Sequence, residues 1–318
     1  MSVTIERYRD EFKAEWDAFV KNAKNATFIL ERDYMDYHSD RFTDCSLMFY
    51  KKESLIAVLP ANIDRKQNTL QSHGGLTYGG LIMHNDTKCS DVIEIFASMA
   101  DYMRDTLNVD KLHYKAVPYI YCSKPSDEPL YALFRMRATL LSRTVSTTIE
   151  TACNNKMGQQ RKRGVKKAVK AGINCCESND FGTFWGILEE TLSSCHGCRP
   201  VHTVQEIEML HQLFPDNIRL FTAMESSRIL AGTVVYESKN VAHLQYIAAS
   251  PDGKRCGALD ALIMHLIDNI YNDKRYIDFG ISTEQGGRVL NQGLIQQKEG
   301  FGGSAVVYDT YEIQVAGK

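Results

Sequence analysis

The sequence predicts an α/β protein whose mixed β-sheets are covered by helices. Residues 241–280 read as an apolar strand, a strongly periodic helix and a second strand, and neighbouring strands joined in this way are nearly always parallel. Residues 47–115 follow a similar order of hairpin, helix and strand, without a sequence repeat. A chain of 318 residues fits two domains of about 150 residues each. We therefore expect one domain at residues 1–150 and a second at residues 151–318.

The first half contains one short helix, one hairpin, one long helix and one strand. The short helix has an apolar face formed by Phe12, Trp16, Phe19 and Val20. The remaining elements are predicted at Leu47–Tyr50 and Leu55–Pro60 for the hairpin, Asp91–Leu107 for the long helix, and Lys111–Lys115 for the strand. Together they would pack one helix on a sheet.

A glycine-dense loop lies between the hairpin and the long helix. Residues Ser72–Gly80 read SHGGLTYGG and enclose His73 and Tyr78. Four glycines in so short a stretch indicate turns with positive φ, or close approach of the backbone to a ligand. The alternative is a tight connection that binds nothing, and both interpretations stay open at this point.

The second half alternates helices and strands. Helices are predicted at Phe181–Leu192 and Val204–Leu213, a hairpin at Ile218–Met224 and Leu230–Glu237, and strands at Val241–Ala249 and Tyr276–Gly280. Between the last two strands, Leu259, Leu262, Ile263, Leu266, Ile267 and Ile270 share one face of a helix. This face should pack on the sheet.

A basic helix is predicted at the junction of the two halves. Residues 155–173 carry seven cations and no acidic residue: Lys156, Arg161, Lys162, Arg163, Lys166, Lys167 and Lys170. Gly172 suits the position that ends the helix. Like charges at this spacing destabilise a helix by about 0.2–0.5 kcal/mol per pair, which favours a nearby anion such as a CoA phosphate, a nucleotide-sugar or lipid-linked diphosphate, or tRNA. A solvated helix face is the alternative.

The turn after Ala249 is a candidate anion site. Gly253 and Gly257 would let the backbone approach a phosphate at the start of the following helix, and Lys254 and Arg255 add positive charge. The alternative is a tight surface turn with two solvated cations. The sequence has neither a Walker loop nor the GxGxxG of a dinucleotide fold.

This half of the sequence resembles the GNAT superfamily of acyltransferases. The run Lys254-Arg255-Cys256-Gly257-Ala258-Leu259 is similar to the superfamily loop Gln/Arg-x-x-Gly-x-Gly/Ala, apart from Leu259 at a small-residue position. The resemblance implies that Gly253, Lys254, Arg255, Gly257 and Ala258 contact the donor's pyrophosphate, and that Gln245, Tyr246 and Ile247 line its pantetheine arm. Asn291, followed by Gly300-Phe301, is also similar to a superfamily pattern and joins this set. The usual tyrosine general acid has no counterpart.

The chain also resembles Fem-type peptidyl transferases and their relatives, in which two GNAT-like domains are fused in tandem. Lys170-Ala171-Gly172-Ile173 is similar to the end of their basic helix. The runs RPVHTVQEIEMLHQLFPDN (residues 199–217), SHGGLTYGG and DFGIST are similar to Fem-like acetyltransferases found with bacterial surface-polysaccharide synthesis. The resemblance implies a degenerate first GNAT-like domain, and an acetyl-CoA or other acyl-CoA donor in the second. The acceptor would be an amine or hydroxyl of a sugar nucleotide or glycan precursor.

Three residues are candidates for catalysis. His243 lies on the strand that flanks the thioester in a GNAT fold, and its ordinary pKa of about 6.5 suits a general base. A core histidine bonded to a carbonyl is the alternative. Glu284 is the rival base, with Ser282 beside it. His73, Tyr78 and Lys298 are candidates for holding the acceptor or the leaving group.

Two other functions stay open. The chain could be a Fem-type aminoacyl transferase that uses charged tRNA, although the net charge of -2 and the lack of a long helical hairpin count against it. It could also be a GNAT scaffold that binds a glycan or nucleotide without catalysis. The oligomeric state stays open.

Composition excludes several classes. No apolar run reaches the roughly 18 residues of a membrane span, and the N-terminus lacks the apolar core of a signal peptide. Nine cysteines without a framework spacing then indicate reduced thiols in the cytoplasm. Cys195-His196-Gly197-Cys198 would supply at most three ligands, so we expect no metal site. No cysteine has an adjacent base in the sequence that would make it a nucleophile.

Overall fold

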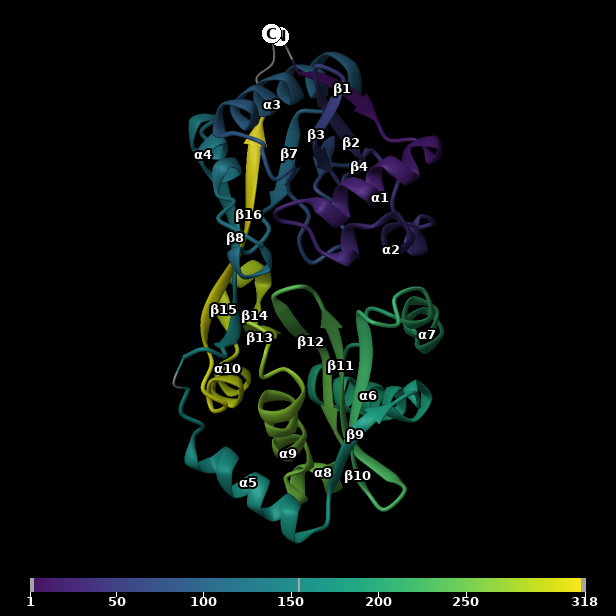
Figure 1. Ribbon diagram of the computed structural model, residues 1–318, viewed down its shortest axis with the longest axis vertical. Helices are drawn as coiled ribbons and strands as arrows, with labels where there is room; N and C mark the ends of the chain where they lie inside the picture. The colour runs from purple at the N-terminus through teal and green to yellow at the C-terminus, as the bar shows by residue number, and fades with distance from the viewer. Residues whose placement is uncertain (1–2, 154, 316–318) are drawn as a thin grey trace. The chain divides into compact units, whose positions relative to one another are not determined.

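The structure is a computed structural model that describes residues 3–153 and 155–315, and it divides into two compact units (Figure 1). The first unit is Met1–Thr144, Glu284–Val289 and Val307–Lys318, and the second is Val145–Thr283 and Leu290–Val306. The predicted domains divide the chain once, at residue 150. In the structure the chain enters the second unit within β8 (Thr139–Glu150), returns briefly to the first at Glu284–Val289, and returns again within β16 (Ser304–Gln314).

The first unit contains a four-stranded antiparallel sheet in the order β1-β2-β3-β6. These strands are β1 (Thr4–Arg7), β2 (Leu47–Lys51), β3 (Ser54–Leu59) and β6 (Ile82–Met83). β2 and β3 form the predicted hairpin. Its turn places Lys52 and Glu53 at positive φ.

The predicted long helix is α3 (Cys89–Tyr102), which continues as a π-helical segment, η4 (Met103–Leu107). The apolar side chains at helical spacing in these two segments are buried: Val92, Ile95, Phe96, Met99, Met103 and Leu107. The segment leads into the predicted strand β7 (Lys111–Lys115), which pairs in parallel with β5 (Thr69–Gln71) and antiparallel with β16. The last pairing explains why Val307–Lys318 counts with the first unit.

The other elements of the first unit are short. They are η1 (Asp10–Phe12), α1 (Lys13–Asn22), η2 (Phe28–Leu30), α2 (Arg32–Met35), η3 (Asp36–His38), β4 (Asn62–Asp64), η5 (Tyr119–Tyr121) and α4 (Glu128–Arg135). α1 is the predicted amphipathic helix, and it buries Trp16, Phe19 and Val20.

The second unit is built on a sheet in the order β8-β13-β12-β11-β10-β9. The strands are β9 (Asn174–Ser178), β10 (Ile218–Glu225), β11 (Arg228–Glu237), β12 (Val241–Ala249) and β13 (Tyr276–Ile281), together with β8. β12 and β13 are parallel, as predicted, and the other neighbours are antiparallel.

Helices cover both faces of this sheet. On one face α9 (Ala258–His265) packs on Ala231 and its neighbours, and on the other Phe184 of α6 (Phe181–His196) lies against Gly232 (Figure 1). The remaining elements are α5 (Gln159–Lys170), α7 (Val204–Leu213), α8 (Pro251–Cys256), η6 (Leu266–Ile270), β14 (Thr283–Glu284), η7 (Gln285–Gly287), β15 (Val289–Leu290) and α10 (Gln292–Glu299).

The two units repeat one arrangement that the sequence does not show. In each, the long helix ends in a π-helical segment that leads into a strand: α3, η4 and β7 in the first unit, α9, η6 and β13 in the second. π-Helical segments are rare, so their recurrence at the same place supports a tandem relation between the units.

The predicted loop after β12 is wrong in one respect, because residues 251–256 form the short helix α8. Ser250 caps it by accepting a hydrogen bond from the Gly253 N–H, and Pro251 occupies the first turn, where its missing N–H costs nothing. Within the described residues, no helix is long and apolar enough to cross a membrane.

Candidate active site

The site is built where β12 and β13 separate. The two strands pair only at Val241–His243 and Tyr276–Asp278, and beyond this point they run apart. On the other side of β12, the pairing with β11 skips Gln245, which forms a β-bulge. Where two parallel strands separate beside a bulge, some of their backbone N–H and C=O groups make no hydrogen bond to a neighbouring strand.

His243 and Asp278 are register partners at the last paired position of this fork. His243 Nδ1 lies 2.7 Å from Asp278 Oδ2. The Asp278 side chain is fully buried, and that of His243 is 13% exposed. A carboxylate partner selects the tautomer in which Nδ1 carries the proton, so Nε2 is the nitrogen that can accept another.

The second carboxylate oxygen of Asp278 is held by β8. Ser146 Oγ and Thr148 Oγ1 both donate hydrogen bonds to Oδ1, the latter at 2.8 Å. Burying a carboxylate is costly unless its oxygens are paired, and here both are. The aspartate is therefore a fixed support for the imidazole.

Gly280 and Lys298 shape the end of β13. Gly280 has a φ of 74°, a backbone conformation that favours glycine, and an added Cβ would lie at van der Waals distance from the His243 ring. Lys298 Nζ donates to the carbonyl oxygens of Gly280 and Ile281, both at 2.8 Å. Burial lowers the pKa of Lys298 to about 8, against the opposing effect of the Asp278 charge. The predicted acceptor-holding lysine thus fixes the strand that carries Asp278.

Residues 155–285 match the family model of the acetyltransferase (GNAT) domain. The solved structure of FemX has a TM-score of 0.66 and 11% identity over 96% of each chain. L-PGS from Bacillus licheniformis has a TM-score of 0.61 and 10% identity, over 98% of this chain and 94% of that chain. No curated protein matched the sequence. The chain therefore contains a GNAT domain, and its overall fold is similar to that of FemX.

The other two predicted catalytic residues, Ser282 and Glu284, lie beyond the end of β13. Ser282 is buried, and among the described residues its Oγ has no hydrogen-bond partner. Its backbone is held by the Val145 carbonyl and the Asn291 N–H. Glu284 is exposed in β14 and counts with the first unit. The structure therefore groups His243 with Asp278 and Lys298, and Glu284 stays a prediction.

The predicted pantetheine residues have differing surroundings. Gln245 is the bulge residue of β12. Tyr246 is buried, and its hydroxyl lies 2.5 Å from Nδ1 of His202. Ile247 is half-buried against the core under α9. Among the three, only Gln245 lies at an irregularity of the strand, and donor contacts of all three stay predictions.

The predicted pyrophosphate residues are packed by the chain itself. A side chain at Gly253 would overlap the Leu230 carbonyl, and one at Gly257, whose φ is 79°, would overlap the Gly164 carbonyl of α5. Ala258 is fully buried. These residues have structural reasons for being small that need no ligand.

Some of the polar residues predicted to bind the donor already form ion pairs or hydrogen bonds within the protein. Arg255 forms an ion pair with Asp252, which also pairs with Arg228, while Lys254 is exposed. Asn291 caps α10, its Oδ1 accepting from the Leu294 N–H at 3.0 Å. An acidic residue at the start of α8 opposes the binding of a phosphate there.

The predicted ligand residues of the glycine-dense loop belong to the first unit. His73 is buried, with a φ of 43°, and its ring stacks on His38 at 5.1 Å. Burial lowers the pKa of His73 to about 3, with smaller effects from neighbouring positive charges. The Tyr78 hydroxyl lies 3.0 Å from Thr27 Oγ1. These contacts place both side chains in the interior of the first unit.

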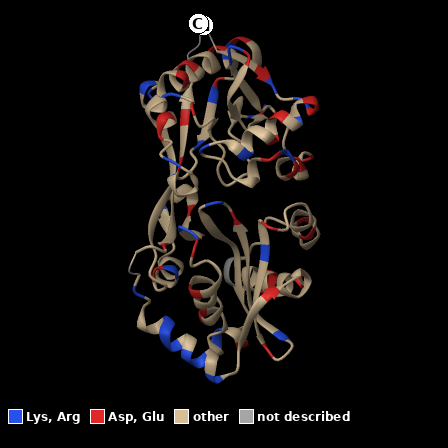
Figure 2. Cartoon of the chain, viewed as in Figure 1, with Lys and Arg blue, Asp and Glu red and all other residues tan. Residues whose placement is uncertain are grey.

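The basic helix α5 is confirmed, and it lies across α9. Arg161 forms an ion pair with Asp260 at 2.7 Å and lies over the Phe301 ring. Five further cations are exposed on α5 and form no ion pair with any described residue: Lys162, Arg163, Lys166, Lys167 and Lys170. Figure 2 shows this run of positive charge. We call these five residues the basic face.

The structure brings no three metal-ligating side chains together in the part of the chain that it describes. The side chains of Cys195 and His196, from the CxxC run, lie outside the described residues. Sequence reasoning missed Asp278, Ser146 and Thr148. A lone acid inside the apolar strand YIDFG was the available signal for the first, whereas only tertiary structure brings β8 beside β13.

Proposed function

We propose that this protein transfers an acetyl or other acyl group from acyl-CoA to an amine or hydroxyl of a sugar nucleotide or cell-surface glycan precursor. The observation that supports it is the His243–Asp278 pair at the fork of β12 and β13. The GNAT family match supports acyl transfer, whereas the donor and the acceptor rest on the sequence resemblance.

The reaction proceeds by direct attack. Nε2 of His243 accepts a proton as the acceptor nitrogen or oxygen attacks the thioester carbonyl, and Asp278 stabilises the imidazolium. Backbone N–H groups around the Gln245 bulge stabilise the oxyanion. The intermediate collapses, the C–S bond breaks, and the proton taken by His243 is returned to the CoA thiolate.

Mass spectrometry of acylated products, with acetyl-CoA and a panel of sugar nucleotides, tests this proposal. We expect His243→Gln and Asp278→Asn to lower the rate by about 10²–10⁴-fold, the usual contribution of a general base. His84→Gln, a change to a partly exposed histidine of the first unit, is the matched control. Full activity of both site variants would exclude His243 as the base.

Donor binding is tested separately by calorimetric titration with acetyl-CoA. We expect binding that Lys254→Glu/Arg255→Glu weakens, because the sequence resemblance assigns these two side chains to the donor's pyrophosphate. Donor binding without turnover on any acceptor would favour the binding-module alternative. No heat from the folded protein would exclude acyl-CoA as donor.

A second candidate function is aminoacyl transfer from charged tRNA, as in Fem-type enzymes. The basic face favours it, and so does the packing of α5 on Gly257, because α5 then occupies space beside the predicted pyrophosphate turn. A polyanionic donor would compensate the repulsion between these cations. Gel-shift titration with tRNA distinguishes it: Lys162→Glu/Lys166→Glu should weaken binding at least tenfold, and the exposed Lys239→Glu should not. Equal binding by both variants would exclude this role for α5.

A further inference from the structure

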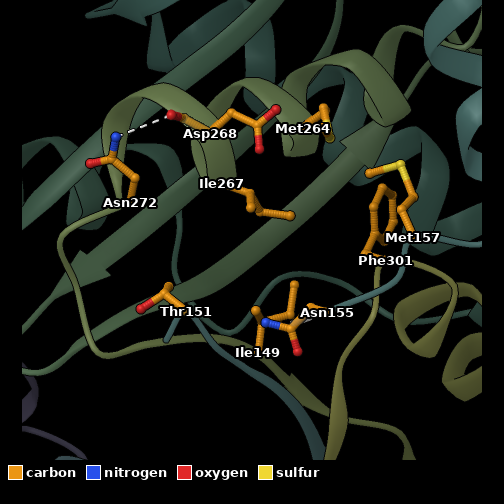
Figure 3. A pocket seen from close by; sticks show the side chains of 9 residues that line it. All are labelled: Ile149, Thr151, Asn155, Met157, Met264, Ile267, Asp268, Asn272 and Phe301. Carbon is orange, nitrogen blue, oxygen red and sulfur yellow. Dashed lines mark hydrogen bonds between the residues drawn. The ribbon is translucent and has the colours of Figure 1, made fainter. Parts of the chain in front are cut away.

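The second unit contains a cavity that is separate from the candidate active site. None of the residues that line it has been discussed above as catalytic or donor-binding. Its volume is about 350 Å³, within the range of small-molecule sites. It is lined by Ile149, Thr151, Asn155, Met157, Met264, Ile267, Asp268, Asn272 and Phe301 (Figure 3). Ile149 is buried and Asp268 is exposed, so the cavity runs from the core to the surface.

The inner walls of the cavity are apolar. Figure 3 shows Met264 and Ile267 on one side and Met157 beside the Phe301 ring on another, with Ile149 below them. Methionine side chains adapt to ligands of different shape and make favourable contacts with aromatic rings. A ligand therefore needs an apolar body, and an aromatic ring suits this wall.

The wall that bears Ile267 and Asp268 is the π-helical segment η6. π-Helical turns within α-helices occur frequently at functional sites. Here the wider turn presents two successive residues to the cavity, Ile267 with its apolar side chain and Asp268 with its carboxylate. Apolar and anionic groups are thus offered side by side.

The polar rim offers acceptors. The amide nitrogens of Asn155 and Asn272 donate to backbone carbonyls, and so does the Thr151 hydroxyl. These bonds leave the amide oxygens of both asparagines for a ligand. Asp268 adds a carboxylate, which forms no ion pair with any residue that the structure describes. Acceptor oxygens with a net negative charge select a cation that donates hydrogen bonds.

We propose that this cavity binds a small protonated amine with an apolar, preferably aromatic, body. The ammonium group donates to the Asp268 carboxylate, while the ring packs between Ile267, Met264 and Phe301. The apolar body of this ligand suits the apolar walls, and its positive charge suits the Asp268 carboxylate at the rim. An anion would instead be repelled by this carboxylate.

The cavity lies on the opposite face of the sheet from the His243–Asp278 pair. Ile149 pairs with Ile277 and faces the core under α9, while the neighbouring Thr148 pairs with Asp278 and bonds it. Successive residues of a strand point to opposite faces. The amine site is therefore independent of the proposed reaction, and its ligand is not the group that attacks the thioester.

Three isosteric probes test the charge preference by calorimetry and ligand-observed NMR: 2-phenylethylamine, 2-phenylethanol and 3-phenylpropanoate. We expect the amine to bind with a Kd of about 1 mM or tighter, as suits a ligand of this size. The alcohol should bind at least fivefold more weakly, and the carboxylate should not bind. No amine binding, or equal binding of all three probes, would overturn the proposal.

Variants locate the site. Asp268→Asn should weaken amine binding at least fivefold and leave the alcohol unaffected, because only the charge is removed. Asp216→Asn, a change to an exposed acid of the same unit, should change neither. Ile267→Trp should fill the cavity and abolish binding of both, with circular dichroism to verify folding. If it misfolds, Asp268→Asn decides, and amine binding that survives this change overturns the assignment.

Discussion

At the scale of single residues, Asp278 is a carboxylate inside a buried strand. Its burial is tolerated because one oxygen faces His243 and the other accepts from Ser146 and Thr148. Removing it would leave two buried hydroxyl groups and an imidazole without their common partner. The residue therefore matters for stability as well as for the proposed base.

We predict that Asp278→Ala lowers the free energy of unfolding by about 3–5 kcal/mol, the usual cost of breaking a buried charged network. Thr148→Val, which removes one of the hydrogen bonds, should cost only about 1 kcal/mol. Urea unfolding of the purified variants measures both. Equal costs for the two changes would contradict the central position of Asp278.

Lys298 predicts a pH dependence of stability. Burial lowers its pKa in the folded protein from 10.5 to about 8. Between these values the unfolded chain binds more protons at this site than the folded chain, so the contribution of Lys298 to stability rises as pH rises from about 8 to 10.5. Below pH 8 both states are protonated, and the full cost of burying the ammonium is present.

The comparison with Lys298→Met isolates this effect from other titrating groups. The free energy of unfolding of the wild type, minus that of the variant, should increase by up to about 3 kcal/mol across this pH range. Denaturant unfolding at pH 7.5, 9 and 10.5 measures it. A difference that stays constant or decreases would show that Lys298 is not buried as a charge.

At the scale of elements, the packing of α5 on α9 depends on two glycines. A side chain at Gly164 would overlap the Asp260 carboxylate, and one at Gly257 would overlap the Gly164 carbonyl. The Arg161–Asp260 ion pair lies at the same crossing. The basic helix is therefore docked through its small residues, which leaves the basic face outward.

We predict that Gly257→Ala destabilises the protein by about 2 kcal/mol or more, because it combines a backbone at positive φ with a steric overlap. Gly186→Ala is the matched control, since Gly186 lies within α6 with no atom near the position of an added methyl group. That change should be neutral or stabilise by up to about 1 kcal/mol. Thermal unfolding of both variants checks the contrast, and similar melting temperatures would contradict it.

At the scale of the whole molecule, the end of the chain completes the unit in which the chain begins. β16 pairs with β7 over Thr310–Gln314, and its Ile313 lies in the core beneath α3. Cutting after residue 150 would therefore expose the edge of β7 and remove a core side chain.

We predict that a fragment of residues 1–150 does not unfold cooperatively, because an exposed strand edge and an incomplete core remain. Adding a synthetic peptide of residues 304–314 should restore a cooperative transition in circular dichroism. A peptide with Ile313→Asp should fail to do so. Cooperative unfolding of the fragment alone would show that β16 is dispensable.

Local pattern was sufficient for both hairpins and for the longer helices. β12 and α7 have the predicted bounds, and the buried faces of α1 and α3 are those that helical spacing predicts. β8 and β16 were not predicted, although residues 304–314 are rich in valine and tyrosine. Each of these strands passes from one unit to the other, so its burial changes along its length and the alternation is weak.

The amino-acid sequence was enough to predict the fold class, both hairpins and the longer helices, and the choice of His243 and Lys298 as residues of interest, because each depends on near neighbours in the chain. Tertiary structure alone decided which partners these residues have. Asp278 is 35 positions from His243, and Ser146 is 132 positions from Asp278. It also decided that, in the predicted phosphate turn, Gly257 faces α5 and Gly253 faces β11. Side-chain spacing shows which residues share a surface, whereas the contacts across that surface depend on which strands and helices the fold makes neighbours.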